Sequence, residues 1–212
     1  LDEFRPDVVH AHHLTCLSTD LLDAAQARGV RTVMTLHDFW MGCPRGQRMT
    51  PDLELCDEIV VERCRDCLAR MWSGWFSPTA ATGDAAVEGR LRDIAMLQRY
   101  HEWIRGVLGR VDQLITPSRS SRELFIRQGV DGGKIRVVEN GLDHAPFRAL
   151  RRVPHAGFRF GFIGSVLPTK GVHVLIDAFS RLGAPDARLE IHGEACGWHE
   201  GTHYHARLPP LA

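Results

Sequence analysis

The sequence lacks an excess of charge of either sign, and it lacks any long apolar run. Its 26 Lys and Arg residues are balanced by 26 Asp and Glu residues. This balance argues against a protein that binds nucleic acid through overall basicity, so we expect no nucleic-acid partner. No apolar run approaches the roughly 20 residues that span a bilayer, and no signal-peptide pattern follows Leu1. We therefore expect a soluble, cytoplasmic chain.

Length and cysteine content narrow the class further. A chain of 212 residues can bury a substantial core and holds one or two domains. Six cysteines would suit a secreted disulfide scaffold, but the remaining pattern is that of a large α/β core, so we expect reduced thiols. The chain starts at Leu1 inside a strand-like unit and stops soon after its last strand signal, which leads us to expect a fragment.

Two strands near the start each lead into histidines. Residues 7–10 (DVVH) predict a short buried strand, and residues 31–36 (RTVMTL) predict a second one after an intervening helix. His12 follows the first strand, and His37 and Asp38 follow the second. Open α/β sheets bind ligands at the carboxyl ends of their strands, so these three side chains are candidates for ligand contact, although any one of them alone is more often structural.

The middle of the chain continues the alternation of strands and helices after one interruption. Residues 39–78 are dense in Cys, Pro, Gly and Trp, and such a long interruption is usually functional or separately stabilised. A long helix is expected over 82–110, and strands are expected over 113–116 and 135–139.

Ser118 lies where the strand 113–116 gives way to a helix. Its hydroxyl can cap that helix or contact a ligand, and the residues do not decide between these roles. Ser120 and Glu123, three residues apart, have the spacing of a capping box.

A composition shift marks a domain boundary at residues 142–157, and a strand, loop and helix follow. The strand ends at Gly164, and the loop carries Ser165 and Lys170 before helical periodicity begins. Backbone N–H groups at a helix start attract anions, and Lys170 adds a full positive charge, so this loop is a candidate phosphate subsite. An ordinary turn with a solvated lysine is the alternative. Residues 187–191 predict the second strand of this domain.

Four cysteines within the interruption form the most specific metal-ligand pattern. Cys43, Cys56, Cys64 and Cys67 have the spacing C-x12-C-x7-C-x2-C. Four thiolates with one tight pair suit tetrahedral zinc, and a closed zinc site stabilises loops that lack a core. A disulfide pair and free thiols are the alternatives, and nothing indicates the redox chemistry of an iron–sulfur cluster.

Taken together, the motifs resemble one known family. PDVVHAHH, TLHDFW, LITPSRSSRELF, RVVENGLD, FGFIGSVLPTKGVHVLIDAF and LEIHG stand in the order and spacing of retaining glycosyltransferases of family 4. The segment HDFWMGCPRGQ through ERCRDCL is similar to a bacterial subgroup with a cysteine-bearing loop at this place.

The resemblance implies an α/β, GT-B-like fold of two Rossmann-like parallel-sheet domains, both incomplete here. Residues 1–141, with the insertion 39–78, would form the acceptor-side domain, 142–157 the linker, and 158–212 the start of the donor-binding domain. The donor would be a nucleotide-diphosphate sugar, and the acceptor a glycan or a lipid-linked molecule. No catalytic metal is expected.

The resemblance also implies roles for single residues. His37 would lie beside the transferred sugar and help to stabilise charge as the glycosidic bond breaks. Lys170 would neutralise the leaving diphosphate. Three further residues would line the acceptor side or the cleft floor: Asp38, His12 and Ser118.

Two departures from the family pattern affect the donor side. Family members commonly carry Gly-Arg where this chain has Gly164 and Ser165, so a second basic partner of the diphosphate is missing. The family's paired glutamates lie beyond residue 212, and we expect the 212-residue chain alone to be inactive. The alternative is a non-catalytic truncated homologue or a zinc-stabilised interaction module.

Aromatic residues in and around the cysteine segment suggest a place in the cell. Such rings more often pack against their own domain, but an exposed group of them can contact the inner face of the membrane. The residues are Phe39, Trp40, Trp72, Trp75 and Phe76.

Overall fold

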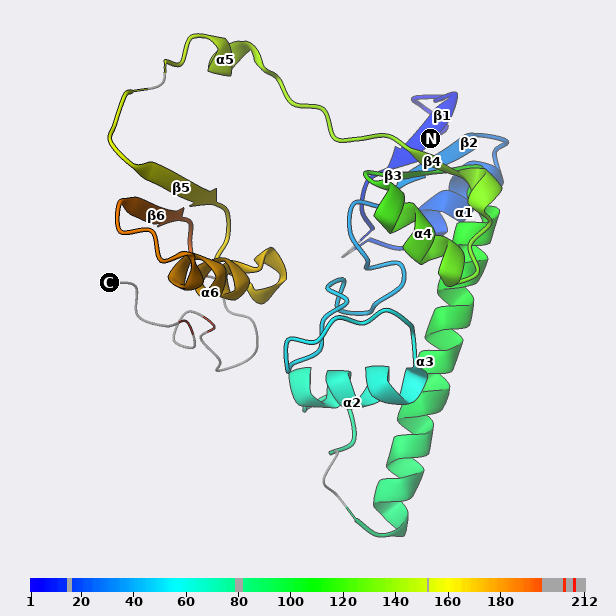
Figure 1. The fold of residues 1–212 in the computed structure, drawn as a ribbon. Coiled ribbons are helices and arrows are strands. Elements are labelled where there is room, and N and C mark those ends of the chain that lie inside the picture. The colour runs from blue at the N-terminus through cyan, green and yellow to red at the C-terminus, as the bar shows by residue number, and fades with distance from the viewer. Residues whose placement is uncertain (15–16, 79–81, 152, 196–203, 205–207, 209–212) are drawn as a thin grey trace. The chain divides into compact units, whose positions relative to one another are not determined.

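The structure, a computed structural model, describes residues 1–14, 17–78, 82–151, 153–195, 204 and 208. The chain divides into two compact units, residues 1–142 and 143–212 (Figure 1). Each unit is built around its own parallel sheet, and each is described by itself below.

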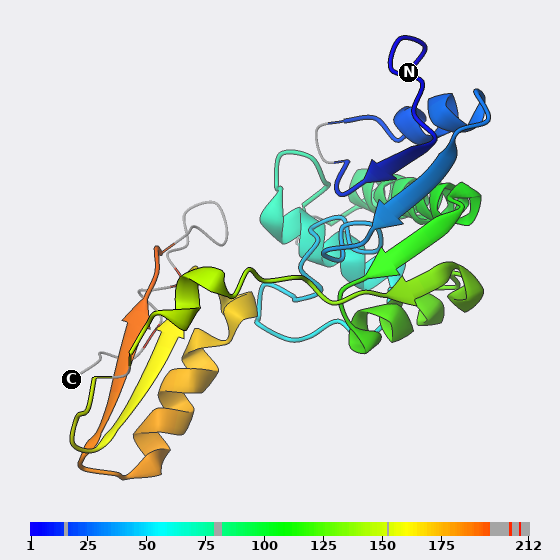
Figure 2. The ribbon, with the colours of Figure 1, turned by 90° about the horizontal axis from the view of Figure 1, so that it is seen from above.

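Unit 1 contains a four-stranded parallel sheet with the strand order β1-β2-β3-β4 (Figure 2). The strands are β1 (Val8–Ala11), β2 (Arg31–Thr35), β3 (Gln113–Thr116) and β4 (Ile135–Val137). Because the sheet is parallel and β1 pairs with β2 through Ala11 and Met34, the segments that follow these two strands leave the same edge. This register brings the histidines after β1 and β2 to one place.

The helices of unit 1 cover the sheet and extend beyond it. They are α1 (Asp20–Gln26), α2 (Val61–Met71), α3 (Asp84–Arg110) and α4 (Arg119–Arg127), with a short 3₁₀ turn η1 (Gly132–Lys134) before β4. Their apolar faces bury a core that includes Leu22 of α1, Leu108 of α3 and Phe125 of α4, together with Met34 and Leu114 of the sheet.

The fold departs from the sequence predictions at three places in unit 1. β1 is an edge strand, and Val8 is half-exposed, so the prediction of a buried strand was wrong. Helix α4 is capped by Ser118, whose Oγ accepts a hydrogen bond from Ser121 N, so the capping box at Ser120 was misplaced by two residues. The cysteine-rich interruption contains a regular helix, α2, that its composition concealed.

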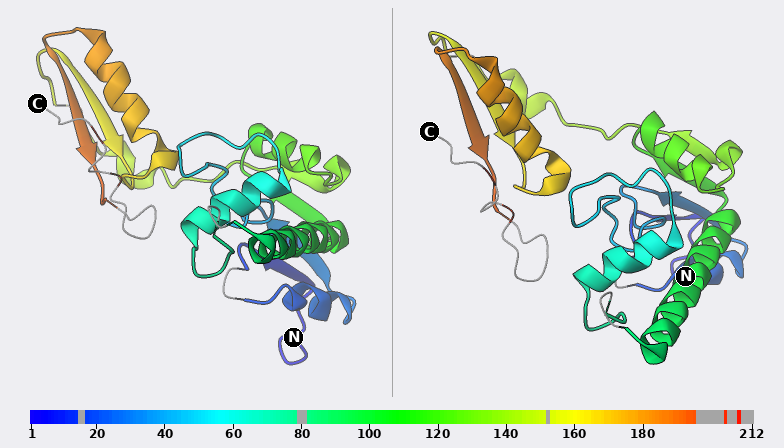
Figure 3. Two further views of the ribbon diagram at one scale, coloured as in Figure 1. Left: turned by 90° about the horizontal axis from the view of Figure 1, so that it is seen from below. Right: turned by 60° about the horizontal axis from the view of Figure 1, so that its bottom comes forward.

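Helix α2 lies against the part of α3 that extends away from the sheet (Figure 3). A small apolar cluster joins them: Leu68, Ala69, Phe76 and Leu97. Beside it Arg65, whose side chain is 1% exposed, donates to Asp93 Oδ2 at 3.2 Å and to Asp66 Oδ1 at 3.1 Å. The cysteine-rich segment is thus fastened to α3 through a charged network as well as through apolar contact.

The described residues of unit 2 form two parallel strands and one main helix. Its elements are α5 (Ala145–Arg148), β5 (Phe158–Ile163), η2 (Pro168–Lys170), α6 (Val172–Leu182) and β6 (Ala187–His192). Helix α6 buries Val172 and Ile176, and Phe179 meets Phe160 of β5 edge to face with ring centroids 5.9 Å apart. Leu182 at the end of α6 is half-exposed, and α5 is a single helical turn within the expected linker.

Candidate functional site

Two histidine rings meet at the carboxyl edge of the unit 1 sheet. His12 Nδ1 lies 2.9 Å from His37 Nε2, within hydrogen-bonding distance, and the two rings stack with centroids 5.2 Å apart. Both side chains are exposed. Since a neutral imidazole carries one donor and one acceptor nitrogen, the bond to His12 couples the tautomers of the two rings and leaves the other nitrogen of His37 available to a ligand.

His10 supports this pair from within β1. Its Nε2 lies 2.8 Å from the Thr35 hydroxyl at the end of β2, and its ring is 4.2 Å from that of His12. Burial lowers the pKa of His10, and the neighbouring His12 and His37 lower it further because their positive charges would repel its own. His10 therefore stays neutral more readily than a solvated histidine.

Asp38 has two partners within the protein. Its Oδ2 lies 3.1 Å from His13 Nε2, and its Oδ1 accepts a hydrogen bond of 2.8 Å from Trp40 N. The second bond forms a local turn that shapes the start of the cysteine-rich segment. The structure thus places the predicted residues His12, His37 and Asp38 at one edge and shows that Asp38 also holds the backbone there.

Ser118 lies at the end of β3, which is the neighbour of β2 in the sheet. Its hydroxyl caps α4, as described above, so the structural role left open by the sequence is observed. A contact with substrate stays a prediction.

The candidate phosphate loop of unit 2 runs from Gly164 to Lys170. Gly164, with φ of 154°, receives the chain from β5, and its N–H donates to His192 O. Lys170 ends η2, is exposed, and directly precedes Gly171, the N-cap of α6. A positive side chain and a helix N-terminus therefore stand next to each other, as an anion site requires.

The four predicted metal ligands line one small cavity of about 30 Å³. All four cysteines are free thiols and half-buried. Burial raises the pKa of Cys64 to about 12, and the charges of Cys43, Cys56 and Cys67 add to this rise. The charges of these cysteines thus affect one another. No three His, Cys, Asp or Glu side chains among the described residues are arranged to hold a metal ion.

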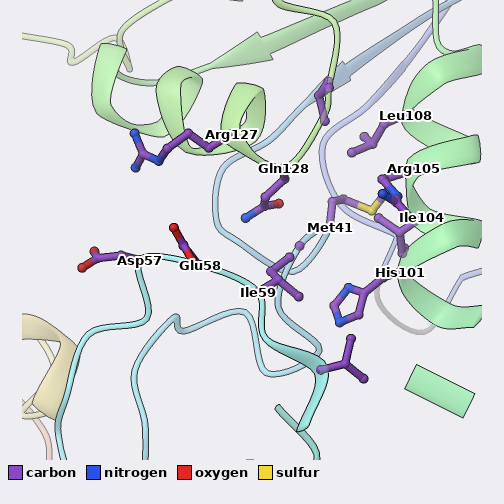
Figure 4. A pocket seen from close by; sticks show the side chains of 13 residues that line it. Met41, Asp57, Glu58, Ile59, His101, Ile104, Arg105, Leu108, Arg127 and Gln128 are labelled. Carbon is purple, nitrogen blue, oxygen red and sulfur yellow. The ribbon is translucent and has the colours of Figure 1, made fainter. Parts of the chain in front are cut away.

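A larger pocket, of about 490 Å³, lies between α3, the end of α4 and the segment before α2 (Figure 4). His101 and Gln128 reach into it from two sides, with Asp57, Glu58 and Arg105 also in its lining. His101 is 9% exposed, and within the described residues its Nε2 has no hydrogen-bond partner. Burial lowers the pKa of His101, and Arg105 lowers it further.

The sequence contains a signal for the burial of His101. His101 follows Leu97 by four residues and precedes Ile104 by three, which places it on the buried stripe of α3. A histidine on such a stripe is expected to be buried, and its ring nitrogens then need hydrogen-bond partners.

The fold and the places of the candidate side chains define the fold class of the protein. The fold is α/β, with two units that each hold a parallel sheet, and the candidate side chains follow strand ends. A solved structure with the same fold, that of HepE from Anabaena in complex with UDP-glucose, matches at a TM-score of 0.51 and 18% identity. The match covers 95% of this chain and 43% of HepE, so the chain spans less than half the length of that protein. The predicted GT-B-like fold class is confirmed.

A family model identifies the chain more narrowly than the fold does. The model of Glycosyltransferase Family 4 matches residues 1–145, and the chain belongs to this family, as its motifs predicted. A comparison with curated proteins returned no match. No helix among the described residues is long and apolar enough to cross a membrane.

Proposed function

We propose that the protein acts as a retaining glycosyltransferase, moving a sugar from a nucleotide-diphosphate donor to a hydroxyl group of a glycan or lipid-linked acceptor. The observation that carries this proposal is the family match over residues 1–145. The UDP-glucose bound by HepE supports a nucleotide sugar as donor.

In the proposed reaction the bond between the sugar C1 and the diphosphate oxygen breaks, and its electron pair leaves with the nucleoside diphosphate. The acceptor oxygen forms a new bond to C1 on the same face and passes its proton to the departing diphosphate. Negative charge grows on the leaving diphosphate while positive charge grows on the sugar, so fixed charges and dipoles placed near each atom lower the barrier.

We assign the stabilisation of these two charges to His37 and Lys170. His37 would contact the sugar through the ring nitrogen that its bond to His12 leaves available. Lys170, together with the N–H groups at the start of α6, would receive the diphosphate, and the backbone of Gly164 and Ser165 would line the same loop. A lysine and a helix N-terminus can supply this stabilisation without a catalytic metal.

We also propose that the enzyme works in the cytoplasm, in peripheral contact with the membrane that would carry a lipid-linked acceptor. Of the five aromatic residues considered above, Trp75 is 86% exposed and Trp72 is 39% exposed. Phe76 is buried, and Phe39 and Trp40 pack against the core of unit 1, so only the two tryptophans support a surface contact.

The test uses the protein expressed from its complete reading frame. It is incubated with a panel of nucleotide sugars, and release of the nucleoside diphosphate and transfer to model acceptors are measured. His37→Ala and Lys170→Ala should each lower the rate by about 100-fold, as loss of one group that stabilises transition-state charge does. The exposed His144→Ala should leave the rate unchanged.

The anomeric configuration of the product, read by NMR, tests retention separately. Inversion would overturn the retaining mechanism alone. A protein that neither binds nor turns over any nucleotide sugar would overturn the enzymatic function and favour a non-catalytic module.

A further inference from the structure

The cysteine-rich segment brings four thiols together from three stretches of chain. Cys43 lies in the turn that follows β2, where its N–H donates to Phe39 O at 2.7 Å. Cys56 N donates to Arg48 O at 2.9 Å, next to the isolated bridge between Met49 and Leu55. Backbone hydrogen bonds, and not the thiols themselves, thus set these two positions.

The other two cysteines belong to one helical turn. Cys64 and Cys67 lie three residues apart in α2 and therefore share a face of that helix. This face lines the same cavity of about 30 Å³ as Cys43 and Cys56. A space of this size is enough for a single small ion or water molecule and too small for an organic ligand.

Arginine side chains surround the same cavity. Arg45, Arg48 and Arg63 all line it, and Arg45 donates to Cys67 Sγ at 3.4 Å. Arg45 also donates to Met49 O at 2.7 Å, and Arg48 donates to Cys56 O, so these guanidinium groups are held in place. Four thiolates around a divalent cation carry a net charge of −2, which neighbouring guanidinium groups offset.

The stretch before α2 has no regular secondary structure of its own. Between Thr35 at the end of β2 and Val61 at the start of α2, the described chain forms no helix and no named strand. An irregular segment of this length pays a large conformational entropy on folding, and a closed metal site is a common compensation.

We propose that Cys43, Cys56, Cys64 and Cys67 together bind one structural zinc ion that fastens the irregular stretch between β2 and α2 to α2 itself. Binding releases the four thiol protons and forms four Zn–S bonds with no change of oxidation state. As placed, the thiols do not form a complete ligand set. Zinc binding therefore requires the four side chains to reorient until their sulfur atoms converge on one metal ion.

The test is metal content together with thiol reactivity in the full chain. The protein is purified from zinc-supplemented medium without chelator and analysed for metals. One zinc per chain is expected, and four more thiols should react with a thiol reagent after chelation than before it. Cys64→Ser should reduce the zinc content, whereas Met49→Leu, which removes a sulfur from the same cavity lining but no thiol, should leave it unchanged.

A second measurement covers the case in which Cys64→Ser fails to fold. Replacing zinc by Co²⁺ in the unaltered protein should give the thiolate-to-metal charge-transfer band and the visible bands of a tetrahedral thiolate site. A protein without zinc whose four thiols react freely would overturn the proposal. A disulfide among the four cysteines, detected by mass spectrometry under non-reducing conditions, or a cobalt spectrum without thiolate bands would overturn it as well.

Discussion

The hydrogen bond between the His12 and His37 rings makes His12 a positioning residue for the proposed reaction. His12→Phe keeps a flat ring in the stack but removes the nitrogen that lies 2.9 Å from His37 Nε2. We expect kcat to fall about tenfold, equivalent to about 1.4 kcal/mol, because His37 would lose the partner that selects its tautomer.

The matched variant is His12→Asn, whose side-chain amide can take the place of the imidazole Nδ1. It should retain most of the activity, and its pH profile of kcat should resemble that of the unaltered enzyme. Activity in His12→Phe as high as in His12→Asn would show that the hydrogen bond does not matter.

His101 carries a prediction about pH. Its pKa is lowered in the folded protein, mainly by burial, so between this value and the unfolded value near 6.5 the unfolded chain binds more protons. The stability associated with neutral His101 is therefore fully present above about pH 6.5 and is lost as pH falls. His10, whose pKa is also lowered, acts in the same direction.

His101→Phe should reduce the loss of stability on acidification. At pH 7 it should also raise the free energy of unfolding by about 1 kcal/mol, because it removes a buried nitrogen that has no partner among the described residues. Urea denaturation at pH 7.5 and pH 5.5 measures both effects, with the exposed His144→Phe as control. An unchanged pH dependence would contradict the lowered pKa of His101.

At the scale of elements, one buried ion pair contributes to the packing of α2 against α3. Arg65→Leu would leave Asp93, whose side chain is 13% exposed, without its guanidinium partner. We expect a loss of about 3–5 kcal/mol in the free energy of unfolding, the cost of stranding a buried charge. Arg70→Leu is the matched control on the same helix, since its pair with Asp52 is half-exposed and should contribute less than about 1 kcal/mol.

The double variant Arg65→Leu with Asp93→Leu separates the ion pair from the packing. It should recover much of the stability lost by the single variant, because no charge is then left unpaired. Urea midpoints of the three variants give the comparison. A double variant less stable than Arg65→Leu would locate the cost in packing, not in the charge.

Periodicity and strand-end residues were enough to predict most elements of this chain. The strands around Val33 and Leu114 and the stripe of α3 follow patterns that local physics enforces. Helix α2 was missed because it has only 11 residues, several of them charged or cysteine. The residues that it packs against belong to α3, a separate element of the chain. The position of the Ser118 cap likewise depends on the backbone path out of β3, which residue types alone do not specify.

The candidate sites divide in the same way. His12 and His37 could be placed together from the sequence because parallel pairing aligns strand ends. The grouping of the four cysteines depends on loop geometry, and the pocket at His101 depends on how three separate segments pack. The spacing of the cysteines and the place of His101 on the stripe of α3 can be seen in the sequence, but the cavity and the pocket that they line cannot.

At the scale of the whole molecule, the two compact units should unfold separately. Gly193 follows β6, and a Cβ added there would lie 1.8 Å from Gly164 O, which is backbone and cannot move aside cheaply. Gly193→Ala should therefore unfold or strongly destabilise unit 2, whereas Gly161→Ala in β5, where an added Cβ meets nothing within 4 Å, should be tolerated.

Hydrogen exchange read by mass spectrometry distinguishes the units because it reports peptides separately. In Gly193→Ala, amides of α6 should lose protection while those of α3 keep it, since the described residues that form the core around α3 all belong to unit 1. Loss of protection in α3 to the same extent would show that the units unfold as one cooperative body. Donor binding by Lys170 should then fail in Gly193→Ala even though the His12–His37 edge stays folded, which a nucleotide-sugar titration of the same sample would measure.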